Sequence, residues 1–228
     1  MIGFAGMTHM GWVQAATAAE RGHKVVSLEE NPDEFAKCEL AFITLDVPTE
    51  PDGTGHFEPV EELTREVLEM TTGTVVLMSQ VPPGFTRKFN EPRLYYQVET
   101  LIYGRSFERA MQPERFIVGI WNYKGVPDEK VDFATNYLNY LQSFRCPLFV
   151  MSYESAELSK LAISRFLVAQ VSTSVELDAV ASRVGAKWGD VCKALKSDKR
   201  IGEHAYLRPG KWDDSIHLKR DVMTLRTL

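Results

Sequence analysis

Short apolar runs alternate with stretches of helical spacing over roughly the first 150 residues of the chain. Each run is short enough for a strand that is buried on both faces of a parallel sheet. The predicted strands are Met1–Ala5, Lys24–Leu28, Cys38–Leu45, Thr74–Ser79, Leu94–Val98, Phe116–Ile120 and Pro147–Met151. The stretches with helical spacing are Trp12–Arg21, Val60–Met70, Thr86–Asn90 and Pro127–Phe144. This alternation predicts an α/β fold with a doubly wound parallel sheet of Rossmann type, which binds ligands at the carboxyl ends of its strands.

The pattern changes after residue 151. From Ser155 to Val184 nothing breaks a helix, over a length far above the roughly 11–12 residues of an average helix. Gly185 ends this helix, Trp188–Leu195 predicts a shorter one, and the final segment is polar and irregular. A chain of this length cannot cover so long a helix by itself, so we expect a homodimer through residues 155–184. The predicted domains are residues 1–151, a Rossmann-type domain, and residues 152–228, the long helix with a small helical extension.

The first thirty residues follow the dinucleotide-binding fingerprint with one change. Gly6 stands at the tight turn, Gly11 at the helix packing point, and Glu29 at the end of the second strand, where a carboxylate binds ribose hydroxyls. Thr8 replaces the middle glycine, so its Cβ crowds the phosphates although its hydroxyl could donate to one. Glu29 favours NAD over NADP, because a carboxylate repels a 2′-phosphate. The structural alternatives are a glycine turn needed for packing alone and a solvated turn residue at Glu29.

The composition of the chain limits the kinds of partner and the cellular location that we expect. The chain of 228 residues is 44% hydrophobic and 25% charged, with a net charge of −5 and a pI near 5.6, which argues against nucleic acid or an anionic membrane surface. No apolar run approaches the roughly 20 residues of a membrane span, and the chain starts with a strand rather than a signal peptide. Cys38, Cys146 and Cys192 have no pair spacing, so we expect buried thiols in a reducing cytoplasm and no metal site.

Eight short motifs, taken in order, resemble the UDP-glucose/GDP-mannose dehydrogenase family. They are Gly6-x-Thr8-x-x-Gly11, Val47–Thr49 with Asp52-Gly53, Ser79–Gly84, Glu99–Gly104, Pro113–Gly119, Ala156–Leu161, Arg200–Gly202, and Pro209-Gly210 leading to Arg220-Asp221. The resemblance implies an NAD-binding Rossmann domain and a long dimerising central helix. The family adds a second, nucleotide-sugar-binding domain, which this chain is expected to lack because it stops where that domain would begin.

The same resemblance exposes one decisive departure. The family oxidises a sugar primary alcohol to a carboxylate in two hydride transfers, and the second needs a cysteine that adds to the aldehyde. The corresponding segment here is Asp214–Asp221, of matching length, and His217 stands at the cysteine position. Further departures are Gln80 for a threonine, Ser164 for an asparagine, Val98 for a proline, and Asp214-Ser215 for a glycine pair. Covalent capture of an aldehyde by the family's route is therefore not expected.

Site residues follow from the resemblance, position by position. The implied catalytic residues are Lys160, which steadies an oxyanion, Asp221, which holds water and accepts a proton, Glu99, and His217 as a general base for one alcohol oxidation. The implied cofactor contacts are Gly6, Thr8, Met10, Gly11, Glu29, Thr49, Ser79, Gln80 and Arg220. The implied substrate contacts are Leu101, Ser164 and Arg200, the last of which is expected at the dimer boundary. The structural alternatives are a solvated lysine at position 160, a surface loop acid at 99, and a neutral filler at 217.

Three functions remain open. The first, which we favour, is an NAD-dependent dehydrogenase limited to a single two-electron alcohol oxidation or carbonyl reduction. The second is an inactive relative that binds a nucleotide or a partner. The third is a four-electron dehydrogenase completed by a separate chain, which the missing cysteine argues against.

Overall fold

The computed structural model describes residues 1–99, 101–102, 104–123 and 133–228. The chain divides into two compact units. The first, which we call the sheet unit, contains Met1–Pro48 and Gly55–Lys160. The second, the helical unit, contains Thr49–Thr54 and Leu161–Leu228. A short loop from the first half of the chain thus belongs with the C-terminal helices.

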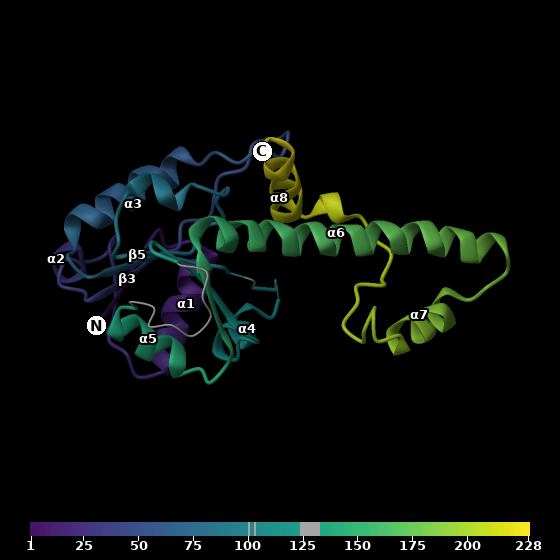
Figure 1. Ribbon diagram of the computed structural model, residues 1–228, viewed down its shortest axis with the longest axis horizontal. Helices are drawn as coiled ribbons and strands as arrows, with labels where there is room; N and C mark the ends of the chain where they lie inside the picture. Colours follow the sequence, from purple (N-terminus) through teal and green to yellow (C-terminus); the bar gives the residue numbers. More distant parts are fainter. Residues whose placement is uncertain (100, 103, 124–132) are drawn as a thin grey trace. The chain divides into compact units, whose positions relative to one another are not determined.

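Seven strands form one sheet, in the order β2-β1-β3-β4-β5-β6-β7 (Figure 1). They are β1 (Ile2–Ala5), β2 (Val25–Ser27), β3 (Leu40–Ile43), β4 (Thr74–Leu77), β5 (Leu94–Gln97), β6 (Phe116–Ile120) and β7 (Leu148–Ser152). All residues of β1, β3, β4, β5 and β6 are buried. The apolar runs are buried strands because both sides of each strand face covering helices. The predicted strands are confirmed, with ends that differ by one or two residues.

Helices cover both faces of the sheet. One face carries α1 (His9–Glu20), α4 (Ser106–Met111) and α5 (Thr135–Gln142), and the other carries α2 (Pro32–Phe35) and α3 (Glu58–Met70) (Figure 1). A short 3-10 helix, η1 (Thr86–Phe89), precedes β5. This arrangement confirms the doubly wound α/β fold. The pattern of the sequence did not predict α2 and α4, and residues 127–132 of the predicted Pro127–Phe144 helix lie outside the described residues.

One strand pair corrects the prediction of an all-parallel sheet. β5 and β6 are antiparallel, with Tyr96 opposite Gly119, while β6 and β7 are parallel to each other. The remaining pairs are parallel. A buried strand has the same apolar composition in either direction, so its sequence pattern does not indicate its direction.

Aromatic rings form much of the core between the sheet and α5. The Phe42 ring of β3 lies 5.4 Å from the Phe4 ring of β1 and 5.5 Å from the Tyr140 ring of α5. The Tyr137 ring packs edge-on against Phe42 at 6.1 Å. Ring pairs at these distances add to the burial of apolar area. The strands whose carboxyl ends carry the predicted site are therefore held in a dense core.

Three α-helices dominate the helical unit. α6 (Tyr153–Arg183) starts in the sheet unit and continues into the helical unit, and it is followed by α7 (Trp188–Ser197) and α8 (Ile216–Arg226). The long helix and the short helix after it are confirmed. The prediction of an irregular final segment is wrong for α8. Ser215 is the N-cap of this helix, and its hydroxyl accepts a hydrogen bond from the Leu218 N–H at 3.4 Å. Its buried side includes the polar residues Arg220, Asp221 and Thr224, so no apolar stripe marked it as a helix.

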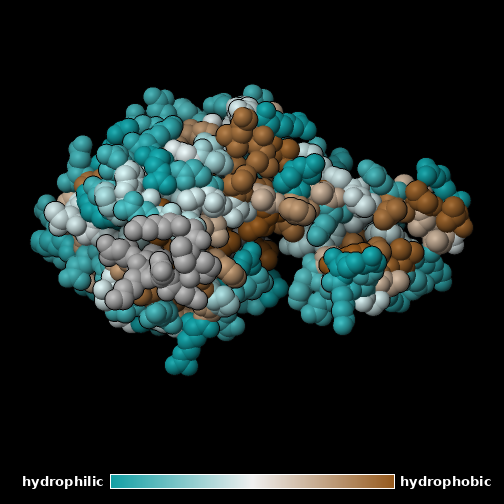
Figure 2. All heavy atoms as spheres, in the orientation of Figure 1, coloured by the Kyte–Doolittle hydropathy of each residue, from teal (hydrophilic) through white to brown (hydrophobic). Residues whose placement is uncertain are grey.

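Apolar side chains remain exposed on the helical unit. Phe166 of α6 is 73% exposed, and Val184, directly after the end of α6, is 71% exposed. Val175, Leu177 and Val180 of α6 are exposed between them. Figure 2 shows hydrophobic atoms gathered around the end of α6. Among the described helices, none is both long and apolar enough to cross a membrane.

Candidate functional site

The glycine turn between β1 and α1 needs both of its glycines. Gly6 has φ +75°, and a Cβ there would lie 2.6–2.8 Å from the backbone and Cβ of Leu45, just after β3. A Cβ on Gly11 would lie 2.6 Å from the Thr44 hydroxyl oxygen. Only glycine combines a left-handed conformation with so close an approach. The turn is therefore pressed against the carboxyl end of β3, as a dinucleotide-binding turn requires.

Glu29 folds back onto this turn from the end of β2. Its Oε1 accepts hydrogen bonds from the N–H of Gly6 at 2.7 Å and of Met7 at 3.1 Å. These bonds bring the predicted ribose-binding carboxylate and the predicted phosphate turn together. The alternative of a turn residue that is merely solvated does not agree with this geometry.

Thr8 is the N-cap of α1, and its side chain is used within the fold. Its hydroxyl donates to the Thr44 carbonyl at 2.9 Å, so the suggestion that this hydroxyl donates to a phosphate is corrected by the structure. α1 begins directly after Thr8, and the N–H groups in the first turn of a helix can bind an anion.

The loop after β4 adjoins the same turn. The Ser79 hydroxyl donates to the Leu45 carbonyl at 2.6 Å, and the Leu45 backbone is the group that Gly6 approaches. Gln80 follows Ser79 directly. The structure thus brings together the predicted cofactor residues of the sheet unit, Gly6, Thr8, Met10, Gly11, Glu29, Ser79 and Gln80, at the carboxyl ends of β1, β2 and β4.

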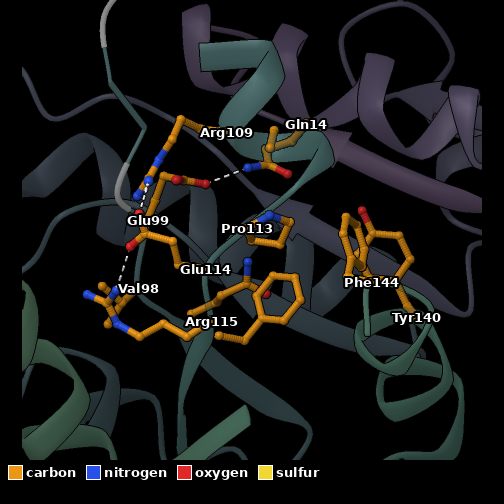
Figure 3. Close-up of a pocket in the computed structure, with 12 residues that line it drawn as sticks. Gln14, Val98, Glu99, Arg109, Pro113, Glu114, Arg115, Tyr140 and Phe144 are labelled. Carbon is orange, nitrogen blue, oxygen red and sulfur yellow. Dashed lines mark hydrogen bonds and ion pairs between the residues drawn. The ribbon is translucent and has the colours of Figure 1, made fainter. Parts of the chain in front are cut away.

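Glu99 lines a small cavity on the α1 and α4 face of the sheet (Figure 3). Its carboxylate accepts a hydrogen bond from the Gln14 amide of α1. The cavity is small, with a volume of about 30 Å³. Arg109 pairs with Glu114 at its rim. Glu99 is therefore part of a polar cluster against α1, and is more than a surface loop acid.

Lys160 is only 7% exposed, which excludes the alternative of a solvated lysine. It lies on α6, one turn before Ser164. The predicted substrate residue Leu101 is half-buried in the short described segment 101–102.

Five predicted site residues meet in the helical unit. Asp221 is 1% exposed, and its Oδ2 accepts a hydrogen bond from the Ser164 hydroxyl at 2.6 Å. Arg220, also 1% exposed, has Nη1 at 3.2 Å from the Thr49 hydroxyl oxygen and Nη2 at 3.3 Å from His217 Nδ1. α8 supplies three of these residues, α6 one, and the loop Thr49–Thr54 one. The loop is further tied to α8 because Lys219 donates to the Pro51 carbonyl at 2.9 Å.

The contact between Arg220 and His217 sets the state of the imidazole. A guanidinium has donors only, so His217 Nδ1 must accept, and the proton of the neutral ring lies on Nε2. The Nδ1 lone pair that a general base would use is directed at Arg220.

Arg200 lies apart from this cluster in the described contacts. It is exposed and pairs with Asp198 in its own turn, with Nη2 2.6 Å from Oδ2 and Nε 3.0 Å from Oδ1. Among the described residues, no group of three or more histidine, cysteine, aspartate or glutamate side chains could hold a metal ion.

Comparison with known proteins agrees with the fold and with these motifs. The sequence profile of the UDP-glucose/GDP-mannose dehydrogenase family, central domain, matches residues 154–228. The UDP-glucose 6-dehydrogenase of Caenorhabditis elegans is 25% identical over 227 residues, which cover 91% of this chain and 47% of that protein. That of Campylobacter jejuni is 24% identical, over 81% of this chain and 47% of that protein. Residues 154–228 thus match the central domain of this family, and most of the chain is similar in sequence to UDP-glucose 6-dehydrogenases.

Solved structures give the same fold. A UDP-glucose dehydrogenase from Pyrobaculum islandicum superposes with a TM-score of 0.77 at 23% identity, over 99% of this chain and 67% of that one. A GDP-mannose dehydrogenase from Pseudomonas aeruginosa, in a ternary complex, gives 0.74 at 18% identity, over 100% and 65%. The predicted family resemblance is confirmed. The chain spans less than half the length of the curated relatives it matches.

Several residues that build the site were not predicted. Thr44 and Leu45 position the glycine turn, Gln14 holds Glu99, and Glu157 binds the loop after β4. Glu157 stands inside the family motif Ala156–Leu161, and this motif was the available signal for it. The other three lie in ordinary helix and strand patterns, which carried no signal for a role in the site.

Proposed function

We propose that this protein is an NAD-dependent dehydrogenase that performs a single two-electron step between an alcohol and its carbonyl compound. Its relationship to nucleotide-sugar dehydrogenases supports a nucleotide sugar as the substrate class. The observation that carries the proposal is the pair of hydrogen bonds from the Gly6 and Met7 N–H groups to Glu29. They hold a carboxylate at the glycine turn, where it can accept from ribose hydroxyls and repel a 2′-phosphate.

The glycine turn fits the cofactor. A Cβ is excluded at Gly6 and at Gly11, and the first turn of α1 offers N–H groups to a pyrophosphate. Bound NAD⁺ would supply one function, the acceptance of a hydride from the alcohol carbon. Met10 and Gly11 would hold its phosphates, Gly6 would leave the turn open for their approach, and Glu29 would bind its ribose. Ser79 and Gln80 would line the next loop. Thr49 and Arg220 are proposed cofactor contacts of the helical unit.

The remaining steps belong to the chain's own side chains. Lys160 would stabilise the alkoxide that forms as the alcohol loses its proton. Asp221, buried and bonded to the Ser164 hydroxyl, would accept that proton. One alcohol and one NAD⁺ would thus give one carbonyl compound, one NADH and one proton. Glu99, Leu101 and Arg200 are proposed to orient the substrate.

The reaction should stop at the carbonyl compound. A second hydride loss requires a nucleophile that stays bonded to the aldehyde carbon, and the imidazole of His217 accepts from Arg220 instead. Product analysis and NADH stoichiometry test this with a panel of nucleotide sugars and simple hydroxy acids. One NADH per substrate with a carbonyl product is expected. Two NADH with a carboxylic acid product would overturn the single-step proposal.

A binding module is the second candidate. The Arg220–His217 contact favours it, because this contact removes a lone pair from the position at which the family places its nucleophile. Calorimetry separates the two candidates. Heat with NAD⁺ but no NADH from any alcohol in the panel selects the binding module. No heat with NAD⁺ or NADP⁺ at millimolar concentration contradicts the cofactor assignment itself.

We further propose a homodimer through residues 155–184 in a reducing cytoplasm. The exposed apolar side chains of Phe166 and Val184 support the dimer, because a second copy could cover them. The three free thiols support a reducing cytoplasm. Stable homodimer interfaces bury about 2,000 Å² or more, which a helix of 31 residues can supply from two copies.

A further inference from the structure

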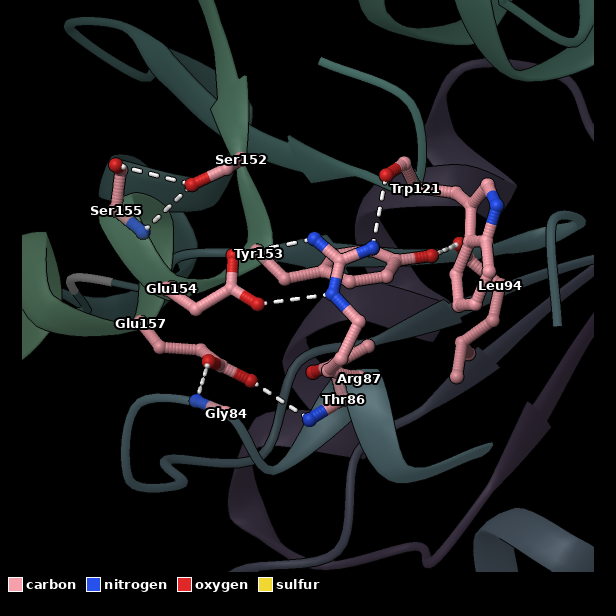
Figure 4. Close-up of polar contacts among 10 residues, drawn as sticks. All are labelled: Gly84, Thr86, Arg87, Leu94, Trp121, Ser152, Tyr153, Glu154, Ser155 and Glu157. Carbon is pink, nitrogen blue, oxygen red and sulfur yellow. Dashed lines mark hydrogen bonds and ion pairs between the residues drawn. The ribbon is translucent and has the colours of Figure 1, made fainter. Parts of the chain in front are cut away.

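Glu157 is a fully buried carboxylate on the second turn of α6. Its Oε2 accepts a hydrogen bond from the Gly84 N–H at 2.6 Å, and its Oε1 accepts one from the Thr86 N–H at 2.8 Å (Figure 4). Gly84 has φ +89°, so the loop turns sharply at the point where it meets the carboxylate. One side chain thus holds both ends of the turn that leads from the Ser79–Gly84 loop into η1.

A second set of contacts anchors the same end of α6. Arg87 binds Glu154 through two nitrogens, at 2.8 and 3.1 Å, and donates to the Trp121 carbonyl at 2.8 Å. Its guanidinium lies 5.0 Å from the Trp121 ring and 4.8 Å from the Tyr153 ring (Figure 4). The Tyr153 hydroxyl donates to the Leu94 carbonyl. These bonds fix the start of α6 against the loops that flank η1 and β6.

The helix also packs closely on the sheet at this point. A Cβ on Gly119 of β6 would lie 2.9 Å from the Tyr153 Cα and 3.1 Å from the Ala156 Cβ. The start of α6 therefore has little room to slide or rotate. Lys160 follows Glu157 by three residues, so it lies on nearly the same side of the helix about 4.5 Å further along the axis.

The charges around Glu157 are mixed. Burial raises the pKa of its carboxyl to about 7, the hydrogen bonds from Thr86 and Gly84 lower it, and the neighbouring Glu154 raises it slightly. Arg87 and Tyr153 also face it, and Lys160 is the nearest cation on its own helix. Hydration in an opened state would return the carboxyl toward its ordinary value of 4.5. By linkage, opening of this contact becomes easier as the pH rises from 5 to 7.

We propose that Glu157 is a positioning residue that holds the Ser79–Gly84 loop and Lys160 in one fixed frame. The inference rests on the proposed function, in which Ser79 and Gln80 contact the cofactor and Lys160 acts on the substrate. Because the carboxylate binds backbone amides, it sets the path of the loop whichever side chains the loop carries. A shift of the loop would then shift α6, and Lys160 with it.

The test compares Glu157→Gln with Glu154→Gln by amide hydrogen exchange of Gly84 and Thr86 at pH 5 and pH 8. Both oxygens of the Glu157 carboxyl carry lone pairs whether or not the group is protonated, so both can accept. A glutamine offers one acceptor and one NH₂ group, so it can bind one of the two amides but not both. Glu157→Gln is expected to speed exchange at one or both amides at least 10-fold relative to intrinsic rates. It should also remove the wild-type dependence of protection on pH. Glu154→Gln breaks only the Arg87 pair and should keep that dependence.

A second readout links the contact to the cofactor. NAD⁺ affinity of Glu157→Gln is expected to fall about 10-fold, while Glu154→Gln binds within about twofold of wild type. Gly84→Ala perturbs the contact from the loop side through backbone strain alone, since an added Cβ meets nothing within 4 Å, and it replaces Glu157→Gln if that variant does not fold.

The outcomes separate this inference from the proposed function. Unchanged exchange at Gly84 and Thr86, or equal changes in both variants, overturns the inference. Changed exchange with unchanged NAD⁺ affinity also overturns it, because the contact would then be structural only. A wild-type protein that binds no NAD⁺ overturns the proposed function, and exchange still decides whether Glu157 holds the loop.

Discussion

The sheet unit and the helical unit solve the problem of burying apolar surface in opposite ways. In the sheet unit every residue of β1, β3 and β4 is buried, because helices lie on both faces of the sheet. In the helical unit α7 has no buried residue, and Phe166 of α6 and Val184 just after it are largely exposed. The sheet unit therefore carries its own core. The helical unit has polar residues buried and apolar residues exposed, which is the pattern expected of a surface that awaits a partner.

The largest expected effect comes from a substitution among the buried polar residues of the helical unit that removes a proposed catalytic group and keeps the fold. Asp221→Asn should lower turnover about 10²–10⁴-fold, because the proposed proton acceptor is lost while the side chain keeps its shape. Steady-state NADH formation with the best substrate of the panel measures this. Asp214→Asn is the matched control on the exposed approach to α8, and it should retain turnover. Equal losses in both variants would contradict the role of Asp221.

The glycine turn should be the most sensitive point of the sheet unit. Gly6→Ala places a side chain at φ +75°, which costs about 1–3 kcal/mol, and adds an overlap with Leu45. We expect a lower free energy of unfolding in urea and no measurable heat with NAD⁺. Gly22→Ala is the control, because Gly22 has φ +83° with nothing within 4 Å of an added Cβ. It should lose stability by backbone strain alone and keep its cofactor affinity.

The free energy of unfolding should depend on pH because the carboxyl group of Glu157 is buried. Its pKa is about 7 in the folded protein and near 4.5 when hydrated, so between these values the native state binds a proton that the unfolded state lacks. The free energy of unfolding should thus fall as pH rises from 4.5 to 7, by up to about 3 kcal/mol. Urea titrations of Glu157→Gln should lack this fall. In Glu154→Gln the fall should persist, since the Arg87 pair holds the pKa of Glu154 at about 2, below this window.

The smallest effect on the fold, and the most direct test of the helical unit, concerns its exposed surface. Phe166→Glu puts a charge on the proposed dimer face, and it should change the light-scattering mass from that of two chains to the 25.8 kDa of one. The sheet unit should unfold at the same urea concentration as before. Phe107→Glu, on the exposed surface of α4, is the control and should stay dimeric. A wild-type mass of 25.8 kDa at micromolar concentration would refute the dimer.

The two units also differ in how well their sequence predicts them. Apolar runs such as Leu40–Ile43 and Val75–Leu77 fix buried strands, so the sheet was predictable strand by strand. The reversed direction of β6 and β7 relative to the other strands was not predictable, because an apolar run has the same pattern in either direction. α8 escaped prediction because Arg220 and Asp221 occupy the side that an apolar stripe marks in an ordinary helix.

The site shows the same divide. Gly6, Gly11 and Glu29 lie within one strand–helix–strand unit, so spacing alone brought them together. The bond between Ser164 and Asp221 joins residues 57 positions apart, and no periodicity encodes such a distance. The family resemblance predicted both residues as part of the site, but only the structure shows that they form a hydrogen bond.

If Glu29 selects NAD as proposed, its position has a consequence for redesign of the cofactor preference. Conversion of an NAD site to NADP ordinarily starts by replacing the acidic residue with a small or basic one. Here that replacement would also strip two acceptor bonds from the amides of Gly6 and Met7, so the turn would lose its conformational support together with its selectivity. Cofactor specificity and local rigidity would then depend on one side chain, and a redesign would have to supply a new acceptor for those amides before a 2′-phosphate could be accommodated.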